Sequence, residues 1–289
     1  MKFFKKIWHW VSAPFRWLGK TLVKPFRKAA DFFREEPDEA PMSESLQMAF
    51  EEPASFLEHV GALRKHILRS FVVLILCAVV AFIYLQPLLD FISQPIHGLD
   101  QLTAVDVTEP IAVGMRVVLL AAFTAALPYI MLELFFFIGP ALSRRARAIG
   151  LLSIPLIVIF FFAGMAFTFY VILPTGLPVL LNFVNVETQI RPSSYVKFTT
   201  NLMFWIGVVF EFPLLAYLLT AMRILTPRDL VKNWRIAVVV IAFLAALITP
   251  TIDPINMMLV MVPLLFLYAL SILLSILAGG GKRRRNLKN

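Results

Sequence analysis

Ionisable side chains inside apolar runs are the residues of this sequence that most clearly suggest chemistry. Glu211 lies well inside such a run, in the sequence Phe-Glu-Phe-Pro, and the proline after it weakens helical hydrogen bonding. An unpaired charge in hydrocarbon is costly and is normally tied to a cavity, a partner or a pathway. We therefore predict that Glu211 has a functional role. The alternative is that its side chain is simply protonated or paired and faces a neighbouring helix. Arg116 and Glu133 stand nearer the ends of their runs, and we expect both to snorkel to the membrane interface.

The side-chain combinations that enzymes use are missing from the sequence. The four histidines, His9, His59, His66 and His97, are scattered along the chain, and Cys77 is alone. There is no metal-ligand set, no Gly-x-Ser-x-Gly nucleophile turn and no Gly-x-x-x-x-Gly-Lys phosphate loop. We therefore predict a protein that is not an enzyme and that uses no cofactor or metal.

The composition indicates a membrane protein. Of the 289 residues, 60% are hydrophobic and 16% are charged, against about half and about a quarter in soluble domains. A helix needs about 20 residues to cross the hydrocarbon core. An all-α membrane protein is predicted, with six spans at 67–85, 111–138, 149–173, 198–221, 236–249 and 255–277. Kinks or broken ends are expected at Pro128, Pro174 and Pro178.

The basic residues predict the orientation of these spans. All 27 Lys and Arg except Arg116, Arg191 and Lys197 lie in residues 1–69, after the last span, or in alternate connections. Because positively charged loops stay in the cytoplasm, this pattern places both termini there. The net charge of +9 follows from this orientation, and no nucleic-acid partner is predicted, since no aromatic-basic binding module is present.

The fifth predicted span is short. It has 14 residues between Arg235 and Pro250, which is roughly 21 Å of helix against a hydrocarbon core of about 30 Å. Either the bilayer thins around the turn at 249–254, or a partner protein shields this hairpin.

The two ends of the chain form separate regions. Residues 1–53 are predicted to be a basic and aromatic amphipathic segment followed by an acidic linker, with an incidental tail as the alternative. No secretory signal is predicted, and Met42 is an alternative start. Residues 54–277 form the membrane domain, and residues 278–289 form a basic cytoplasmic tail. Within the domain, the segment from Phe56 to His66 is predicted to be an amphipathic helix on the cytoplasmic surface.

A set of motifs along about three quarters of the chain indicates a family. They are Phe-Leu-Glu-His and Leu-Arg-Lys at 56–65, Glu109 with Arg116, Pro128, Phe-Ile-Gly-Pro-Ala-Leu at 137–142, Phe-Glu-Phe-Pro at 210–213, Arg235, Thr249-Pro250, Asp253-Pro254, Pro263 and Tyr268. In order and spacing they resemble the TatC family, the multi-spanning subunit of the twin-arginine protein translocase. The resemblance implies a glove-like bundle of six helices with short fifth and sixth helices, in a prokaryotic cytoplasmic membrane.

The resemblance also implies a function, namely recognition of twin-arginine signal peptides and export of folded proteins by the proton-motive force. The expected partners are folded precursors, single-span subunits of the TatA and TatB type, a second TatC-like subunit or copy, and the lipid bilayer. The residues expected to bind the signal at the cytoplasmic face are Glu58, His59, Leu63, Arg64, Pro140 and Leu142. The expected intramembrane or cavity residues are Glu211, Asp253 and Glu109, and those expected to dock a partner helix are Thr249, Asn256 and Met257.

Two positions depart from the family pattern. The family uses two cytoplasmic glutamates to receive the paired arginines of the signal, and the aligned residues here are Ala62 and Ala146. Arginines surround Ala146 and repel a cation, whereas Glu58 is an acid one helical turn from Ala62. The chain therefore either binds signals through Glu58, main-chain acceptors and apolar contacts, or is a divergent paralogue that assembles with the other subunits without reading the arginine pair.

Two further functions compete with the translocase hypothesis. A secondary transporter would use Glu211 and Asp253 as proton or ion sites, but the sequence shows no internal repeat and no matched broken helices. A purely structural assembly scaffold predicts that Glu211→Ala and Asp253→Ala leave export intact.

Overall fold

The regular elements of the described residues are all helices. The computed structural model describes residues 53–96, 98, 106–139, 144–181, 190–222, 224–249 and 254–280, without the side chains of 53–60, 144–146, 180–181, 255–256 and 279–280. The helices are α3 (Pro53–Ile83), α4 (Leu85–Ser93), η1 (Gln94–Ile96), α5 (Glu109–Ile138), α6 (Arg144–Phe167), the π-helix η4 (Thr168–Ile172), α7 (Leu173–Leu181), α8 (Pro192–Val209), α9 (Phe212–Ala221), α10 (Pro227–Lys232), α11 (Trp234–Ile248) and α12 (Pro254–Gly280).

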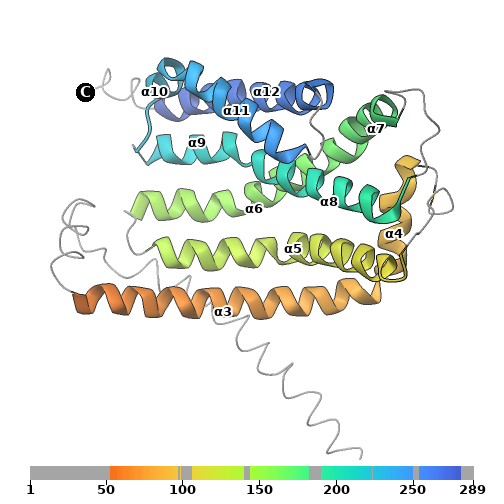
Figure 1. The fold of residues 1–289 in the computed structure, drawn as a ribbon. Helices are drawn as coiled ribbons and strands as arrows, with labels where there is room; N and C mark the ends of the chain where they lie inside the picture. The colour runs from red at the N-terminus through yellow and green to blue at the C-terminus, as the bar shows by residue number, and fades with distance from the viewer. Residues whose placement is uncertain are drawn as a thin grey trace, which may run out of the picture.

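The long helices lie side by side in one bundle, with α3 at one edge and α10, α11 and α12 at the opposite edge (Figure 1). Contacts join α3 to α5, α5 and α6 to α8, and both α9 and α11 to α12. The short helices α4 and α7 lie at one end of the bundle, and α10 lies at the other (Figure 1). The sequence prediction of an all-α protein is thus confirmed for the described residues.

Five helical stretches are long and apolar enough to cross a membrane. They are Gly61–Ile83, Glu109–Ile138, Arg147–Val179, Pro192–Ala221 and Met257–Ala278. The short helix expected near 236–249 is confirmed, because α11 has 15 residues and is therefore roughly 22 Å long. The short sixth helix implied by the family resemblance is wrong, since α12 has 27 residues.

The ends of two predicted spans also differ from expectation. The segment from Phe56 to His66 is not a separate surface helix, because α3 runs through it without a break into the first apolar stretch. Pro174 and Pro178 do not end the third span either. The backbone widens into η4 directly before them, and the N–H of Leu173 donates to the carbonyl of Thr168. A wide turn of this kind lets the helix continue past a proline that has no N–H to donate.

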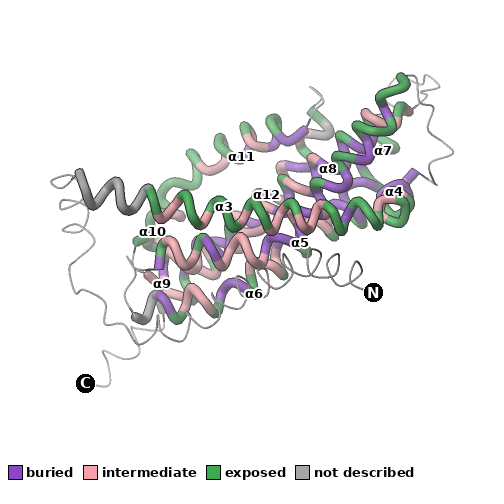
Figure 2. Tube along the Cα trace, turned by 90° about the horizontal axis from the view of Figure 1, so that it is seen from below, coloured by how far each residue is buried: buried purple, intermediate pink, exposed green. Residues whose placement is uncertain are grey.

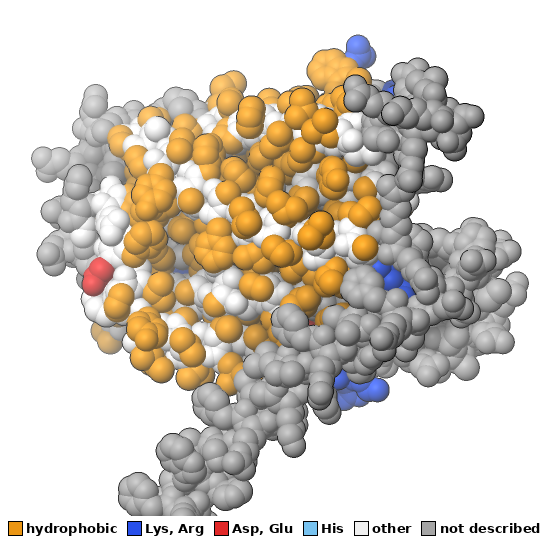
Figure 3. All heavy atoms as spheres, turned by 180° about the vertical axis from the view of Figure 1, so that it is seen from behind, with side chains coloured by type: hydrophobic (Ala, Val, Ile, Leu, Met, Phe, Trp, Pro, Cys, Tyr) orange, Lys and Arg blue, Asp and Glu red, His pale blue; other side chains and the backbone are white. Residues whose placement is uncertain are grey.

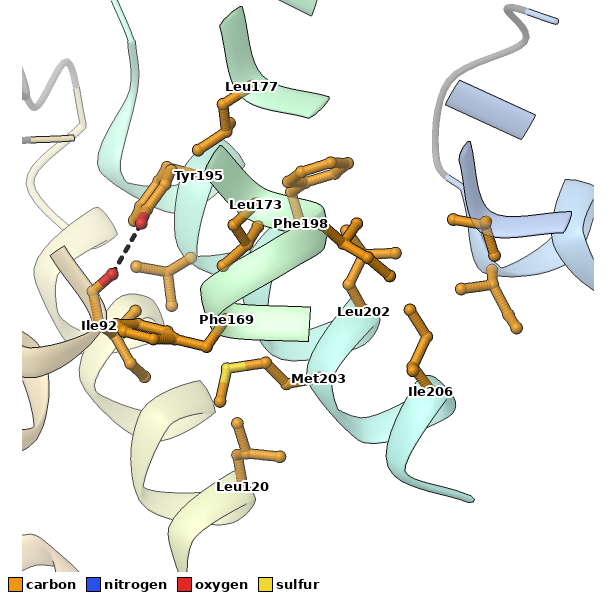
Figure 4. Packing of buried hydrophobic residues seen from close by; sticks show 14 of the residues in the cluster. Ile92, Leu120, Phe169, Leu173, Leu177, Tyr195, Phe198, Leu202, Met203 and Ile206 are labelled. Atoms are coloured by element: carbon orange, nitrogen blue, oxygen red, sulfur yellow. Dashed lines mark hydrogen bonds between the residues drawn. The ribbon is translucent and has the colours of Figure 1, made fainter. Parts of the chain in front are cut away.

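The buried core lies around α8. Tyr195, Val196, Leu202, Met203 and Ile206 on this helix are at most 4% exposed. All five belong to one core cluster, and Figure 4 shows Tyr195, Leu202, Met203 and Ile206 packed with Leu120 of α5 and with Phe169 and Leu173 of η4 and α7. The Tyr195 hydroxyl donates to the Ile92 carbonyl at 2.7 Å, which ties the start of α8 to α4. This cluster holds α5, α7 and α8 in fixed relation.

The outer faces of the bundle are apolar as well. Large hydrophobic side chains such as Ile83 and Val239 are exposed on α3 and α11, two helices with long exposed stretches in Figure 2. Figure 3 shows the same property from one side, where hydrophobic side chains cover much of the surface that the described residues form. A surface of this extent is expected where a protein contacts lipid.

Two glycines set the crossing of α6 and α8. A Cβ atom added at Gly164 would lie 2.8 Å from the Cα of Gly207 and 2.9 Å from the carbonyl oxygen of Ile206. The two backbones are therefore in direct contact, which is how small residues allow membrane helices to pack closely.

Candidate functional site

The helix is interrupted between α8 and α9, at Glu211, the residue that the sequence predicts to be functional. Pro213, the second residue of α9, has no N–H to donate to the Val209 carbonyl one turn earlier. The N–H of Glu211 instead donates to Val208 at 3.1 Å, in a tighter turn, and the helix resumes with Leu215 N–H on the Glu211 carbonyl at 2.8 Å. The Phe-Glu-Phe-Pro motif therefore places Glu211 at a break within the fourth long helical stretch.

The Glu211 carboxyl group is buried without a polar partner. Both of its oxygens are inaccessible to solvent, and neither has a hydrogen-bond partner among the described residues. A backbone group of Phe161 in α6 faces the carboxyl but does not reach hydrogen-bond geometry. An acid in this position can accept a proton or a hydrogen bond from a group that enters the bundle.

A second buried acid, Glu133, lies between α3 and α5. Its Oε2 atom is 2.5 Å from Nδ1 of His66, and its Oε1 atom accepts a hydrogen bond from the Tyr129 hydroxyl at 2.6 Å. Arg69 contributes a guanidinium whose Nη1 is 3.9 Å away. Glu133 is 2% exposed, so the prediction that it snorkels to the interface is wrong. The side chain turns inward because three groups there satisfy its oxygens.

Sequence reasoning missed this cluster of Glu133, His66, Tyr129 and Arg69, although a signal was present. Tyr129 and Glu133 are four residues apart on α5, and His66 and Arg69 are three apart on α3, so each pair shares a helix face. The spacing does not predict that the α3 face and the α5 face contact each other.

A third buried acid, Glu109, joins the first turn of α5 to the start of α8. Its Oε1 atom accepts hydrogen bonds from the backbone N–H of Ser193 at 2.9 Å and from the Ser193 hydroxyl. The Nε atom of Arg191 is 3.8 Å from the same oxygen. Ser193 precedes Glu211 by 18 residues, about 27 Å of helix, so Glu109 and Glu211 do not share one site.

The residues predicted to dock a partner helix are only partly described. Thr249 is buried, and its hydroxyl donates to the Ala245 carbonyl at 2.8 Å, so this group is already paired within its own helix. Met257 is half-buried and packs against the core. The Asn256 side chain and the whole of Asp253 lie outside the described residues.

The predicted signal-binding residues lie mostly outside the description. Leu63 is half-buried and Arg64 is exposed, both on α3 one turn or less from the half-buried Ala62. Glu58 and His59 belong to α3 without described side chains, and Pro140 and Leu142 are outside the described residues. In the part of the chain that the structure describes, no three His, Cys, Asp or Glu side chains are grouped as metal ligands.

Comparison with known proteins identifies the family. The family model described as "Sec-independent protein translocase protein (TatC)" matches residues 58–263 of this chain. The chain belongs to the TatC family. Its TatC relatives include that of Carboxydothermus hydrogenoformans, 32% identical over 78% of this chain and 94% of the relative. Another is the TatC of Deinococcus radiodurans, 34% identical over 77% of this chain and 86% of the relative.

A solved TatC structure has the same fold. The crystal structure of the "Twin Arginine Translocase Receptor- TatC" superposes with a TM-score of 0.67 at 27% identity, covering 76% of this chain and 99% of that one. As a TatC family member, the chain is a multi-pass membrane subunit of a Sec-independent protein translocase. TatC proteins are components of a transport complex rather than of an enzyme family.

Proposed function

We propose that this chain is the core subunit of a twin-arginine translocase. It receives signal peptides at its cytoplasmic face and, with single-span subunits of the TatA and TatB type, exports folded proteins by the proton-motive force. The observation that carries this proposal is the match to 99% of the length of a solved twin-arginine translocase receptor. Because the match covers the whole helical bundle of that receptor, it supports the same translocase function for this chain.

The proposal includes six crossings of the cytoplasmic membrane with both termini inside. In Figure 1 α12 ends at the end of the bundle where α3 begins, as an even number of crossings requires. The distribution of lysine and arginine along the sequence supports the cytoplasm as that side. The short α11 then crosses a thinned bilayer or is covered by a partner.

Within this function Glu211 assists the passage of cargo or of a partner helix. A carboxyl group with both oxygens buried and unpartnered, at a helix break, is suited to receive a polar group that arrives only during transport. Asp253 and Glu109 belong to the same proposal as intramembrane or cavity residues. For Glu109, the contacts with Ser193 and Arg191 favour a role in joining α5 and α8.

Signal binding is proposed at the start of α3 and the connection between α5 and α6. Glu58, His59, Leu63, Arg64, Pro140 and Leu142 are the residues involved, with Glu58 taking the part of the acids that Ala62 and Ala146 replace. Partner docking is proposed at the α11–α12 turn, through Thr249, Asn256 and Met257. The large exposed side chains of α11 support a helix partner there, because they offer a surface for van der Waals packing with a second helix.

The test is export in a host that lacks its own TatC and carries this chain with the single-span subunits of its source organism. A folded reporter with a twin-arginine signal should reach the far side of the membrane. Changing the two signal arginines to lysines should abolish this export and the co-purification of precursor with the chain. If the reporter is not exported and the precursor does not co-purify with the chain, while the single-span subunits assemble normally, the chain is a paralogue that does not read the arginine pair.

A further inference from the structure

A pocket of about 320 Å³ opens between α3, α5 and α8. Its walls include Leu119, Phe123 and Phe204, and its polar lining consists of Arg116, Thr200 and Asn201. The rings of Phe123 and Phe204 meet edge to face with centroids 5.1 Å apart, which closes the gap between α5 and α8. The pocket is therefore an apolar groove that carries a cation and an amide.

Arg116 has no counter-ion in the part of the chain that the structure describes. It is exposed on α5, seven residues or about 10 Å of helix beyond Glu109. Glu109 is itself held by Arg191 and Ser193 at the start of α8, and no ion pair joins it to Arg116. Because a guanidinium within a membrane span is costly when unpaired, an anion from outside the chain would stabilise this position.

Asn201 supplies a second free polar group at the same pocket. Its side chain is half-buried and makes no hydrogen bond to the other described residues. Thr200 is different, because its hydroxyl already donates to the Val196 carbonyl at 2.6 Å. A guanidinium and an amide on facing helices thus offer several N–H donors to one ligand.

We propose that this pocket binds an anionic phospholipid, with its phosphate on Arg116 and Asn201 and one acyl chain along Leu119, Phe123 and Phe204. A guanidinium donates two parallel hydrogen bonds to a phosphate, and the apolar walls match a hydrocarbon chain. The pocket is reached from the bilayer because α3, whose Leu74 forms one wall, buries little of its surface in the bundle, and Arg116 and Leu119 beside it are exposed. Arg116 lies about 10 Å of helix from the start of α5, a distance that a long arginine side chain largely spans toward the headgroup level.

The experiment counts lipids bound to the full-length chain by native mass spectrometry in a neutral detergent, with phosphatidylglycerol and phosphatidylcholine added at equal concentrations. Wild-type protein should prefer phosphatidylglycerol, and Arg116→Gln should weaken its binding about tenfold or more, because both charge-assisted hydrogen bonds of the guanidinium are lost. Arg116→Lys should retain part of the affinity, because it keeps the charge but not the fork. Arg235→Gln is the matched control, since Arg235 is exposed and stacks on Trp234 instead of lining the pocket.

Two results would overturn the lipid site. One is phosphatidylglycerol binding that Arg116→Gln and Arg235→Gln reduce equally or not at all. The other is competition by glycerol 3-phosphate as effective as the lipid, which would identify a soluble phosphate ligand. If Arg116→Gln instead released a co-purified single-span partner and left lipid binding unchanged, the anion would be a carboxylate of that partner. The site and its test do not depend on the proposed translocase function, because lipid binding is measured without export.

Discussion

His66 on α3 and Glu133 on α5 lie 67 positions apart in the sequence and meet with 2.5 Å between Nδ1 and Oε2. The Tyr129 hydroxyl donates to the other oxygen of the same carboxyl group at 2.6 Å. Few other polar contacts join α3 to the bundle among the described residues, since most of this helix is exposed and apolar. The His66–Glu133 contact therefore positions the first long helix, which also carries the proposed signal-binding residues.

Removing this carboxyl group should loosen α3. Glu133→Ala leaves His66 and Tyr129 without their acceptor, and we expect the free energy of unfolding in detergent to fall by about 1–3 kcal/mol. Glu133→Gln, which keeps an acceptor for Tyr129, should cost less. A double-mutant cycle with His66→Ala should give a coupling free energy above about 0.5 kcal/mol. Additive losses would show that the two side chains do not interact in the membrane-embedded protein.

Glu211 should separate stability from function. Replacing its unpartnered buried carboxyl by an apolar side chain removes a group that folding leaves unsatisfied, so Glu211→Leu should keep or raise the free energy of unfolding by about 1 kcal/mol. The same variant should export poorly if the carboxyl receives cargo or a partner. Thermal unfolding of the purified variant and the export assay check the two halves. Export at the wild-type level would remove Glu211 from the proposed function.

The α6–α8 crossing should tolerate no side chain at Gly164. A Cβ atom there would meet the backbone of Gly207 and Ile206 below 3 Å, so Gly164→Ala should separate the helices and cost about 1–3 kcal/mol. Gly61→Ala is the matched control, because nothing lies within 4 Å of its added Cβ on α3. Since alanine favours helix over glycine, the control should stabilise the protein by about 0.5–1 kcal/mol. Thermal unfolding of the purified variants measures both effects. Equal effects of Gly164→Ala and Gly61→Ala would contradict direct contact between the α6 and α8 backbones.

The stability of the N-terminal cap of α10 should depend on pH through the carboxyl group of Asp229. Hydrogen bonds from the Thr226 hydroxyl and backbone N–H, with the charge of Lys232, lower the pKa of this carboxyl group. A lowered pKa stabilises the cap above the ordinary value of about 3.9, and this stabilisation is lost as the pH falls through the folded pKa. Thr226→Val should raise the pKa of Asp229 toward its ordinary value in a carboxyl NMR titration. Lys232→Gln, which removes only the weaker effect, should raise it less.

The predictions from sequence were best where one helix decides the outcome. The apolar runs predicted the long helices because backbone groups in lipid must be paired within the segment itself. The short α11 followed in the same way from the distance between Arg235 and Pro250. Helix ends were predicted less well, because the widened turn before Pro174 depends on how η4 packs in the core.

The acids show what the sequence by itself determined and what only the tertiary structure decided. The Phe-Glu-Phe-Pro motif was enough to predict Glu211 within an apolar span and weakened helical hydrogen bonding beside it, since a proline disturbs its own helix wherever that helix packs. The partners of Glu133 and Glu109 were not predictable, because His66 and Ser193 come from other helices. Which helix faces meet depends on packing across the whole bundle, and that packing turned one expected snorkelling residue into a buried junction.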